Sequence, residues 1–316
     1  MQKLDQLSYP LQEVIIVDAG EDRPGPLQFT NYTKLAIHYI RSEKSVCVQR
    51  NKGIAMARSP WIFLCDDDIE MPADYLDILV NHLANHPECG AVSGSWYQFE
   101  NGKWIAEYPV RSSRSLLFKY IFQQGIWGSI QCPGSNFFVK RLTRYYRQKG
   151  NHISRAGWPV NTRFDGDFFT APVYSLGASL VKKEWLILSP YDEVLDSHGI
   201  GDNYSVIAGF PAASLQVTNK TFVYHHQEPT NRLKSSLQYY RRLLALDYFI
   251  KVKKAPPHVK KIWLIWSITG NLLAFIRAGN KDMMKASFKI LGNLLWSGNP
   301  YNKGLIQERK IINPGF

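Results

Sequence analysis

The sequence predicts an α/β fold built around a mostly parallel sheet. Two short apolar runs, Val14–Asp18 and Trp61–Cys65, end in or lead directly into acidic residues. A continuous apolar run is typical of a strand that is buried on both faces, as parallel strands are. The runs alternate with helical segments, which predicts a parallel sheet whose ligands bind at the carboxyl ends of the strands.

The first part of the chain supplies most of this pattern. We expect strands at Val14–Asp18, Ser45–Gln49, Trp61–Cys65 and Gly90–Ser95. We expect helices at Asn31–Ile40, Asn51–Arg58 and Pro72–His86. The third helix has the strongest signal, because its apolar residues recur at the spacing of one helix face. Residues 96–170 are less regular and rich in Trp, Tyr, Gly and Arg, which is typical of functional loops.

The later part of the chain divides into two regions. A strand at Gly177–Val181, a helix beginning near Asp202 and a strand at Thr221–Tyr224 complete an α/β domain over residues 1–230. Residues 231–316 form a basic extension, in which we expect helices at Leu237–Ile250, Ile262–Ile276 and Met283–Leu295.

Composition excludes several classes of protein. The 316 residues are 45% apolar and 13% aromatic, which is too rich for a disordered chain. Four cysteines without C-x-x-C spacing argue against a disulfide scaffold or a zinc site and suit a reducing compartment. A mean hydropathy of −0.24 and the lack of a long apolar run argue against several membrane spans. No apolar leader segment follows Met1, so we expect the chain on the cytoplasmic side of the membrane.

The positive charge is concentrated in the basic extension. Residues 231–316 hold 16 Lys and Arg against three acids, whereas the whole chain has a net charge of +12. The Ile262–Ile276 helix would be about 22 Å long, short of the roughly 30 Å that a bilayer core requires. Trp263 and Trp266 lie beside lysines, which favours an interfacial helix on an anionic membrane. The alternative is a helical cap on the first domain, and the two are compatible. We expect no nucleic-acid partner, because no aromatic and basic stacking motif is present.

Three consecutive aspartates, Asp66, Asp67 and Asp68, follow the Trp61–Cys65 strand. Carboxylates this close repel one another, and a divalent cation compensates that repulsion. Oxygen ligands favour Mg²⁺ or Mn²⁺, which bind through one or two carboxylates together with substrate phosphates. The alternative is an acidic turn before the next helix. Arg50 and Asn51 near a predicted helix start suit phosphate binding, so together these residues predict a bound nucleoside diphosphate.

A second group of polar residues lies later in the chain. Gly199 and Gly201 permit a tight turn that presents Asp202 at a helix start. Asp202 is a candidate general base, and the alternative is a helix cap. His225 and His226 follow a predicted strand and are candidate metal ligands, although a histidine at this position also serves structural roles.

Six segments resemble, in order, the motifs of the family 2 glycosyltransferases with the GT-A fold. They are Val14–Gly20, Arg50–Ala57, Phe63–Pro72, Gly177–Lys183, Tyr191–Tyr204 and Val223–His225. The resemblance spans roughly residues 1–230. It implies the GT-A nucleotide-diphospho-sugar transferase fold. It also implies transfer of a hexosyl or deoxyhexosyl group from a UDP-, GDP- or dTDP-linked sugar to a hydroxyl, with Mn²⁺ or Mg²⁺.

The resemblance also implies roles for individual donor-site residues. Asp18 matches the aspartate that contacts the base, and Arg50 and Asn51 match the donor-contacting turn. Asp66 and Asp68 match the outer positions of the DxD motif, with Asp66 toward the ribose and Asp68 on the metal, while Asp67 is a further candidate for metal binding.

On the acceptor side, Asp202 matches the catalytic base and His225 the late metal or diphosphate ligand, with His226 as the alternative. Arg155 and Trp158 fall in the expected acceptor loop, where Trp158 either stacks on a sugar or packs in the core.

The chain departs from the family pattern at two places. Gly201 stands where the family usually has a glutamate before the catalytic aspartate. The family begins with a strand and then a helix, and this chain starts at Leu4–Leu7 within what resembles that helix. We therefore expect residues 1–316 to lack the first, interior strand of the fold.

The sequence as a whole predicts a metal-dependent, inverting glycosyltransferase. Its acceptor would be a saccharide or a lipid-linked saccharide in cell-surface polysaccharide synthesis, at the inner face of the cell membrane. Two alternatives remain open: a catalytically inactive relative, and a nucleotidyltransferase, which also uses clustered aspartates with Mg²⁺.

Overall fold

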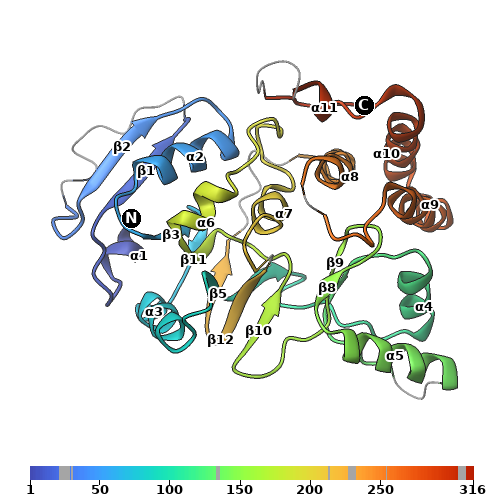
Figure 1. Ribbon diagram of the computed structural model, residues 1–316, viewed down its shortest axis with the longest axis horizontal. Helices are drawn as coiled ribbons and strands as arrows, with labels where there is room; N and C mark the ends of the chain where they lie inside the picture. The colour runs from blue at the N-terminus through green and yellow to red at the C-terminus, as the bar shows by residue number, and fades with distance from the viewer. Residues whose placement is uncertain are drawn as a thin grey trace.

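The computed structural model describes residues 1–20, 29, 31–132, 136–212, 214–226, 233–253, 255–304 and 311–316. Its strands form a large sheet of seven strands, a sheet of three strands and a small sheet of two, with helices packed around them (Figure 1). This arrangement confirms the α/β class.

The strands of the described residues differ widely in length. They are β1 (Val14–Asp18), β2 (Ile37–Arg41), β3 (Trp61–Cys65), β4 (Ile69–Glu70), β5 (Ala91–Glu100), β6 (Lys103–Ile105), β7 (Ile126–Trp127), β8 (His152–Ile153), β9 (Pro159–Asn161), β10 (Phe168–Ala171), β11 (Ala178–Lys182) and β12 (Leu215–His225). The large sheet has the order β10-β12-β5-β11-β3, with β4 on β12 and β6 on β5.

The strands of the large sheet do not all run in one direction. β5 and β12 are parallel neighbours, and β11 lies antiparallel between β3 and β5. The strands β3, β5 and β12 therefore share one direction, and β3 and β12 bring their carboxyl ends, with Asp66 and His225, to the same side. The small sheet holds β1 and β2 as a parallel pair.

A cavity of about 3140 Å³ lies between the large sheet and the small β1–β2 sheet. Residues from the whole of β1 and the whole of β3 line it. In the part of the chain that the structure describes, β1 pairs only with β2 and β3 only with β11, and no strand lies between them.

The helices surround the sheets. They are α1 (Gln2–Asp5), α2 (Val46–Met56), α3 (Tyr75–Asn85), α4 (Ser113–Ile121), α5 (Phe137–Lys149), α6 (Lys183–Leu188), α7 (Asp202–Ile207), α8 (Ser235–Val252), α9 (Lys261–Arg277), α10 (Lys281–Gly292), a π-helical turn at Asn293–Ser297 and α11 (Tyr301–Gly304). The helix α3 covers β5 and β12, whereas α2 packs on β1.

Two elements expected from the sequence were wrong. The segment Asn31–Ile40 is not a helix, because Ile37–Arg41 pairs as β2 with the apolar strand β1. The segment Ser45–Gln49 is not a strand. The Ser45 Oγ accepts a hydrogen bond from the Val48 N–H and caps α2, so the β-branched residues that resembled a strand lie in its first turn.

The C-terminal helices share the main hydrophobic core with the α/β body. Buried residues of α8, α9 and α10 belong to the same cluster as those of β5, β11 and β12. A buried ion pair reinforces this packing, since Arg241 Nη1 lies 3.0 Å from Asp196 Oδ1. Tyr301 donates a hydrogen bond of 3.1 Å to the other oxygen of Asp196. The extension is therefore packed as a helical cap.

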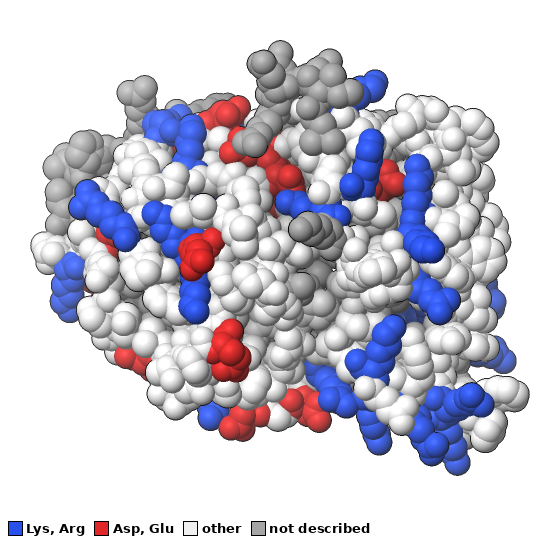
Figure 2. All heavy atoms as spheres, viewed as in Figure 1, with Lys and Arg blue, Asp and Glu red and all other residues white. Residues whose placement is uncertain are grey.

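Charge is unevenly distributed over the molecule. Figure 2 shows that both signs mix on the left, whereas Lys and Arg predominate on the right, where Figure 1 places α4, α5, α9 and α10. Among the helices of the described residues, none is both long enough and apolar enough to span a bilayer.

Candidate active site

One cavity collects most of the residues that the sequence singled out. Its lining includes Asp18 at the end of β1, the aspartates after β3, Arg50 on α2, Asp202 at the start of α7 and His225 at the end of β12. These residues come from five elements that are far apart in the sequence. Their convergence defines a candidate active site.

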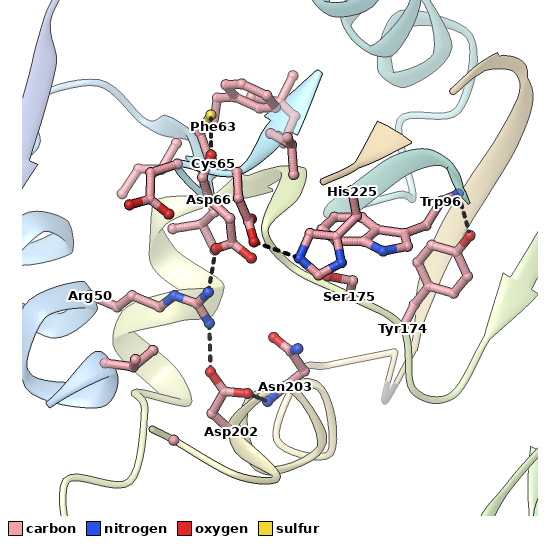
Figure 3. A pocket seen from close by; sticks show the side chains of 18 of the residues that line it. Arg50, Phe63, Cys65, Asp66, Trp96, Tyr174, Ser175, Asp202, Asn203 and His225 are labelled. Atoms are coloured by element: carbon pink, nitrogen blue, oxygen red, sulfur yellow. Dashed lines mark hydrogen bonds and ion pairs between the residues drawn. The ribbon is translucent and has the colours of Figure 1, made fainter. Parts of the chain in front are cut away.

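Arg50 connects the two halves of this site. Its guanidinium lies 2.5 Å from Asp66 Oδ1 and 2.5 Å from Asp202 Oδ2 (Figure 3). Its side chain is only 19% exposed and lies over the ring of Tyr191. Burial lowers the pKa of Arg50, but Tyr191, Asp66 and Asp202 raise it more, so the guanidinium stays charged.

Asp202 is the most perturbed acid of the site. Burial raises its pKa to about 6, although Arg50 and the N–H of Asn203 act in the opposite direction. The Asn203 N–H donates to Asp202 Oδ1 at 2.6 Å. A carboxyl group with this pKa is ionised at neutral pH yet basic enough to accept a proton, as a general base requires.

Two glycines place Asp202 at the cavity. Gly199 and Gly201 have φ values of +63° and +98°, which glycine adopts without strain. A Cβ on Gly201 would lie 3.2 Å from the Cβ of Ala245 on α8. The glycine that replaces the family's usual glutamate therefore fits both the turn and the closely packed C-terminal cap.

Asp66 depends on a close approach between β3 and the segment before β11. The Asp66 N–H donates to the Gly177 carbonyl at 2.7 Å. A Cβ on Gly177 would overlap the carboxylate of Asp66. Glycine at this position thus leaves room for Asp66 to point at Arg50.

The end of β12 brings a histidine to the aspartates. His225 Nε2 lies 2.9 Å from Asp68 Oδ2, and the His225 ring packs against Trp96 at 5.0 Å between centroids. The neighbouring His226 pairs with Glu70 at 2.9 Å and is half-exposed. Of the two histidines, only His225 lines the cavity.

Asp68 and His225 are two predicted metal ligands that the structure brings together. In the described part of the chain, His225 Nδ1 is buried without a hydrogen-bond partner, and no group of three or more acidic, histidine or cysteine side chains is arranged to hold a metal. A cation held at this place would have one carboxylate and one imidazole as protein ligands, so substrate oxygens and water would supply the others. Mg²⁺ and Mn²⁺ bind proteins in this way.

Asp18 is held in its ionised form on the small sheet. Its carboxylate accepts hydrogen bonds from the Tyr39 hydroxyl at 2.5 Å, the Gly20 N–H at 2.8 Å and Arg41 at 2.7 Å. The hydrogen bond from Tyr39, followed by that from Gly20, lowers the pKa of Asp18. The side chain remains an acceptor of hydrogen bonds in the cavity.

Of the three remaining predicted residues, Trp158 lines the cavity, whereas Asn51 and Arg155 do not. Asn51 does not line the cavity, and its amide donates to the Tyr191 carbonyl and to Glu193, both at 2.9 Å. Trp158 lines the cavity, and its indole N–H donates to Ser267 on α9. Arg155 lies outside the cavity, over the ring of Trp263 at 5.2 Å.

Sequence reasoning missed several side chains that shape the site. Tyr39 and Arg41 hold Asp18, Trp96 packs on His225, and Tyr191 lies under Arg50. Tyr39 and Arg41 were missed because the segment Asn31–Ile40 was expected to be a helix. A strand there points alternate side chains to one face, which would have placed Tyr39 and Arg41 together.

The fold is that of the GT-A glycosyltransferases. Residues 2–147 match the sequence model of the family described as glycosyl transferase family 2. This segment, a little under half of the chain, is similar to that family. A structure of S. aureus TarS, residues 1–349, is similar to it with a TM-score of 0.53 at 13% identity, covering 95% of this chain and 75% of that one. A likeness at this identity shows the fold alone.

Two other proteins are similar to this chain, one over about a third of it and the other over nearly all of it. A glucosyl-dolichyl phosphate glucuronosyltransferase of Haloferax volcanii is 27% identical over 108 residues, which are 34% of this chain. The match spans 33%, about a third, of that relative's length. The mannosyltransferase PcManGT from Pyrobaculum calidifontis, solved with GDP-Man and Mn²⁺, covers 98% of this chain and 79% of its own at 17% identity, with a TM-score of 0.46.

Proposed function

We propose that the chain transfers a sugar from a nucleotide sugar to a hydroxyl of a saccharide or lipid-linked saccharide. The observation that carries this proposal is the single cavity in which a buried base, Asp202, faces clustered aspartates across Arg50. The similarity of residues 2–147 to glycosyl transferase family 2 supports glycosyl transfer. The archaeal relative is named for action on a dolichyl phosphate saccharide, and we extend that acceptor class to this chain.

The donor would lie between the two sheets. In this proposal Asp18 accepts a hydrogen bond from the base and Asp66 one from the ribose. Mn²⁺ or Mg²⁺, held by Asp68 and His225 with Asp67 nearby, would stabilise negative charge on the departing diphosphate. The clustered aspartates would repel a diphosphate unless such a cation were bound.

The acceptor hydroxyl would approach Asp202. The Asp202 carboxylate takes the hydroxyl proton as the oxygen attacks the anomeric carbon, while the bond from that carbon to the diphosphate breaks. One guanidinium nitrogen of Arg50 contacts Asp202 and the other contacts Asp66, so Arg50 fixes the position of the base relative to the donor site. A single displacement of this kind inverts the anomeric configuration. In this proposal Trp158, which lines the cavity, would contact the acceptor, whereas Arg155 lies outside the cavity.

The proposal includes a place of action. Residues 1–230 would carry catalysis, and the basic residues 231–316 would attach the enzyme peripherally to the inner face of an anionic cell membrane. Sixteen Lys and Arg in that extension support this attachment. We assign the enzyme to cell-surface polysaccharide synthesis on the same grounds.

The proposal is tested with a panel of UDP-, GDP- and dTDP-sugars, with and without Mn²⁺. A productive donor raises the unfolding temperature in a Mn²⁺-dependent manner and releases a nucleoside diphosphate when an acceptor is added. Release of pyrophosphate would instead identify a nucleotidyltransferase. A folded chain that neither binds nor turns over any donor would identify an inactive relative and refute the proposal.

A further inference from the structure

The outer side of α4 and α9 carries a continuous stripe of exposed apolar side chains. On α9, Ile262, Trp266 and Leu273 are 65%, 42% and 53% exposed and lie on one face of the helix. The Trp266 indole N–H donates to the carbonyl of Ile121 at the end of α4, at 2.8 Å. Because Leu117 precedes Ile121 by one turn and both are exposed, the stripe continues along α4. We call these five residues the α4–α9 face.

The neighbouring helix α5 carries a second exposed apolar pair. The helix α5 packs against α4 through the rings of Tyr120 and Tyr145, whose centroids are 5.7 Å apart. At its start α5 exposes Phe137 and Phe138, at 70% and 76%. Side chains of this size are rarely left in water in such number unless a binding partner covers them.

The surroundings of the face are strongly basic. Residues 108–164, which include α4 and α5, contain ten Lys and Arg and no Asp or Glu. The helix α9 adds Lys261 and Arg277 at its ends. The fold therefore brings a second basic segment, far away in the sequence, next to the basic extension, and Figure 2 shows the positive side of the molecule that results.

We propose that the α4–α9 face docks on a bilayer that contains anionic lipid. Exposed aliphatic and Trp side chains near Lys and Arg are typical of an interfacial helix. The apolar face of such a helix enters the headgroup boundary, while its Lys and Arg contact lipid phosphates. A nucleic acid would satisfy the cations but would leave Leu117, Ile262 and Leu273 in water. This inference names the surface that carries the membrane attachment of the proposed function.

The position of α4 relates this face to the cavity. Ser112, Ser115 and Lys119 line the cavity and lie along one side of α4 and its cap, whereas Leu117 and Ile121 lie on the outer side. A bilayer docked on the outer side would thus be separated from the cavity by the width of one helix. A saccharide attached to a lipid would reach the cavity around α4.

The test measures co-sedimentation with vesicles of phosphatidylcholine, with and without phosphatidylglycerol. We expect the full chain to bind the anionic vesicles more strongly than the neutral ones. The double variant Leu117→Glu/Ile262→Glu should bind the anionic vesicles about 30-fold more weakly, because it places two negative charges against the lipid. The matched control is Ile187→Glu/Leu188→Glu on α6, where the residues are 61% and 66% exposed. Its binding should fall far less.

Two results would overturn this proposal. One is equal binding of the wild-type chain and Leu117→Glu/Ile262→Glu to anionic vesicles, with both variants folded by circular dichroism. The other is binding to single-stranded DNA that is as tight as vesicle binding and insensitive to the double substitution, which would identify a general polyanion surface. Vesicle binding is measured without donor, and transfer to a water-soluble acceptor without vesicles. Failure of one measurement therefore leaves the other informative.

Discussion

The ionisation of Asp202 offers the sharpest test of the proposed chemistry. The substitution Asp202→Asn keeps the shape of the side chain and its contact with Asn203 but removes the carboxylate. If Asp202 is the general base, turnover should fall by about 10²- to 10⁴-fold, which corresponds to about 3 to 5.5 kcal/mol of activation free energy. Donor binding should change much less, because Asp66 still holds Arg50.

The pH dependence follows from the same residue. With a pKa of about 6, Asp202 is about nine-tenths ionised at pH 7 and about one-tenth ionised at pH 5. At saturating donor, the wild-type kcat/KM for the acceptor should therefore rise about tenfold per pH unit below pH 6 and level off above it. The Asp202→Asn variant should lose this limb of the profile.

Stability gives a second, independent measurement. The pKa of Asp202 is higher in the folded chain than in the unfolded chain, so the folded state disfavours its ionised form. The stability that this carboxyl group contributes is present below its ordinary pKa of about 4 and is lost as the pH rises through about 6. Asp202→Asn should therefore unfold at a higher temperature than the wild type at pH 8, and the difference should disappear at pH 4.

The assay follows nucleoside diphosphate release between pH 5 and pH 8 at saturating donor, with thermal unfolding of both proteins in the same buffers. A flat wild-type profile across pH 6 would refute the assignment of the base. Wild-type turnover by Asp202→Asn would reduce Asp202 to a residue that only begins α7.

Two further substitutions test the donor side. Gly177→Ala places a Cβ on the carboxylate of Asp66 and should displace that carboxylate from Arg50. Donor binding should weaken, while the free energy of unfolding changes by only about 1 kcal/mol. The control is Gly292→Ala, where a Cβ meets nothing, and equal donor affinity of the two variants would contradict this reasoning. Asp68→Ala should abolish the Mn²⁺-dependent part of donor stabilisation, about 2.7 kcal/mol at a donor concentration of 100 times Kd. Mn²⁺-dependent stabilisation that persists in this variant would exclude Asp68 as a metal ligand.

Sequence reasoning recovered the elements whose signal is local. The strands β1 and β3 were found because a continuous apolar run that ends in acids has few other interpretations. The helix α3 was found from its apolar face. Ser45 shows the limit of such reasoning, since Val46 and Val48 favour a strand by propensity, and only the Ser45 cap and the burial of this segment decide for a helix.

The candidate site was predictable as a list of residues but not as a geometry. Asp18, Asp66 and His225 were expected at strand ends, and the fold places them there. The bridge from Arg50 to Asp202 joins residues 152 positions apart, and no periodicity reports such a contact. The same holds for β11, whose antiparallel position between β3 and β5 depends on contacts that a single strand's pattern does not encode.

The separation of the two sheets has a consequence for the order in which the molecule gains rigidity. Asp18 belongs to the two-stranded sheet, whereas Asp66 belongs to the large sheet, and a pair of strands alone is only marginally stable. The two sheets are thus separate units of local opening, and a ligand that touches both ties the less stable unit to the more stable one. The backbone amides of β1 and β2 should then exchange with solvent faster than those of β5 and β12, and a bound donor should slow them selectively. The bound donor would therefore stabilise the small sheet against the large one in addition to serving as a substrate.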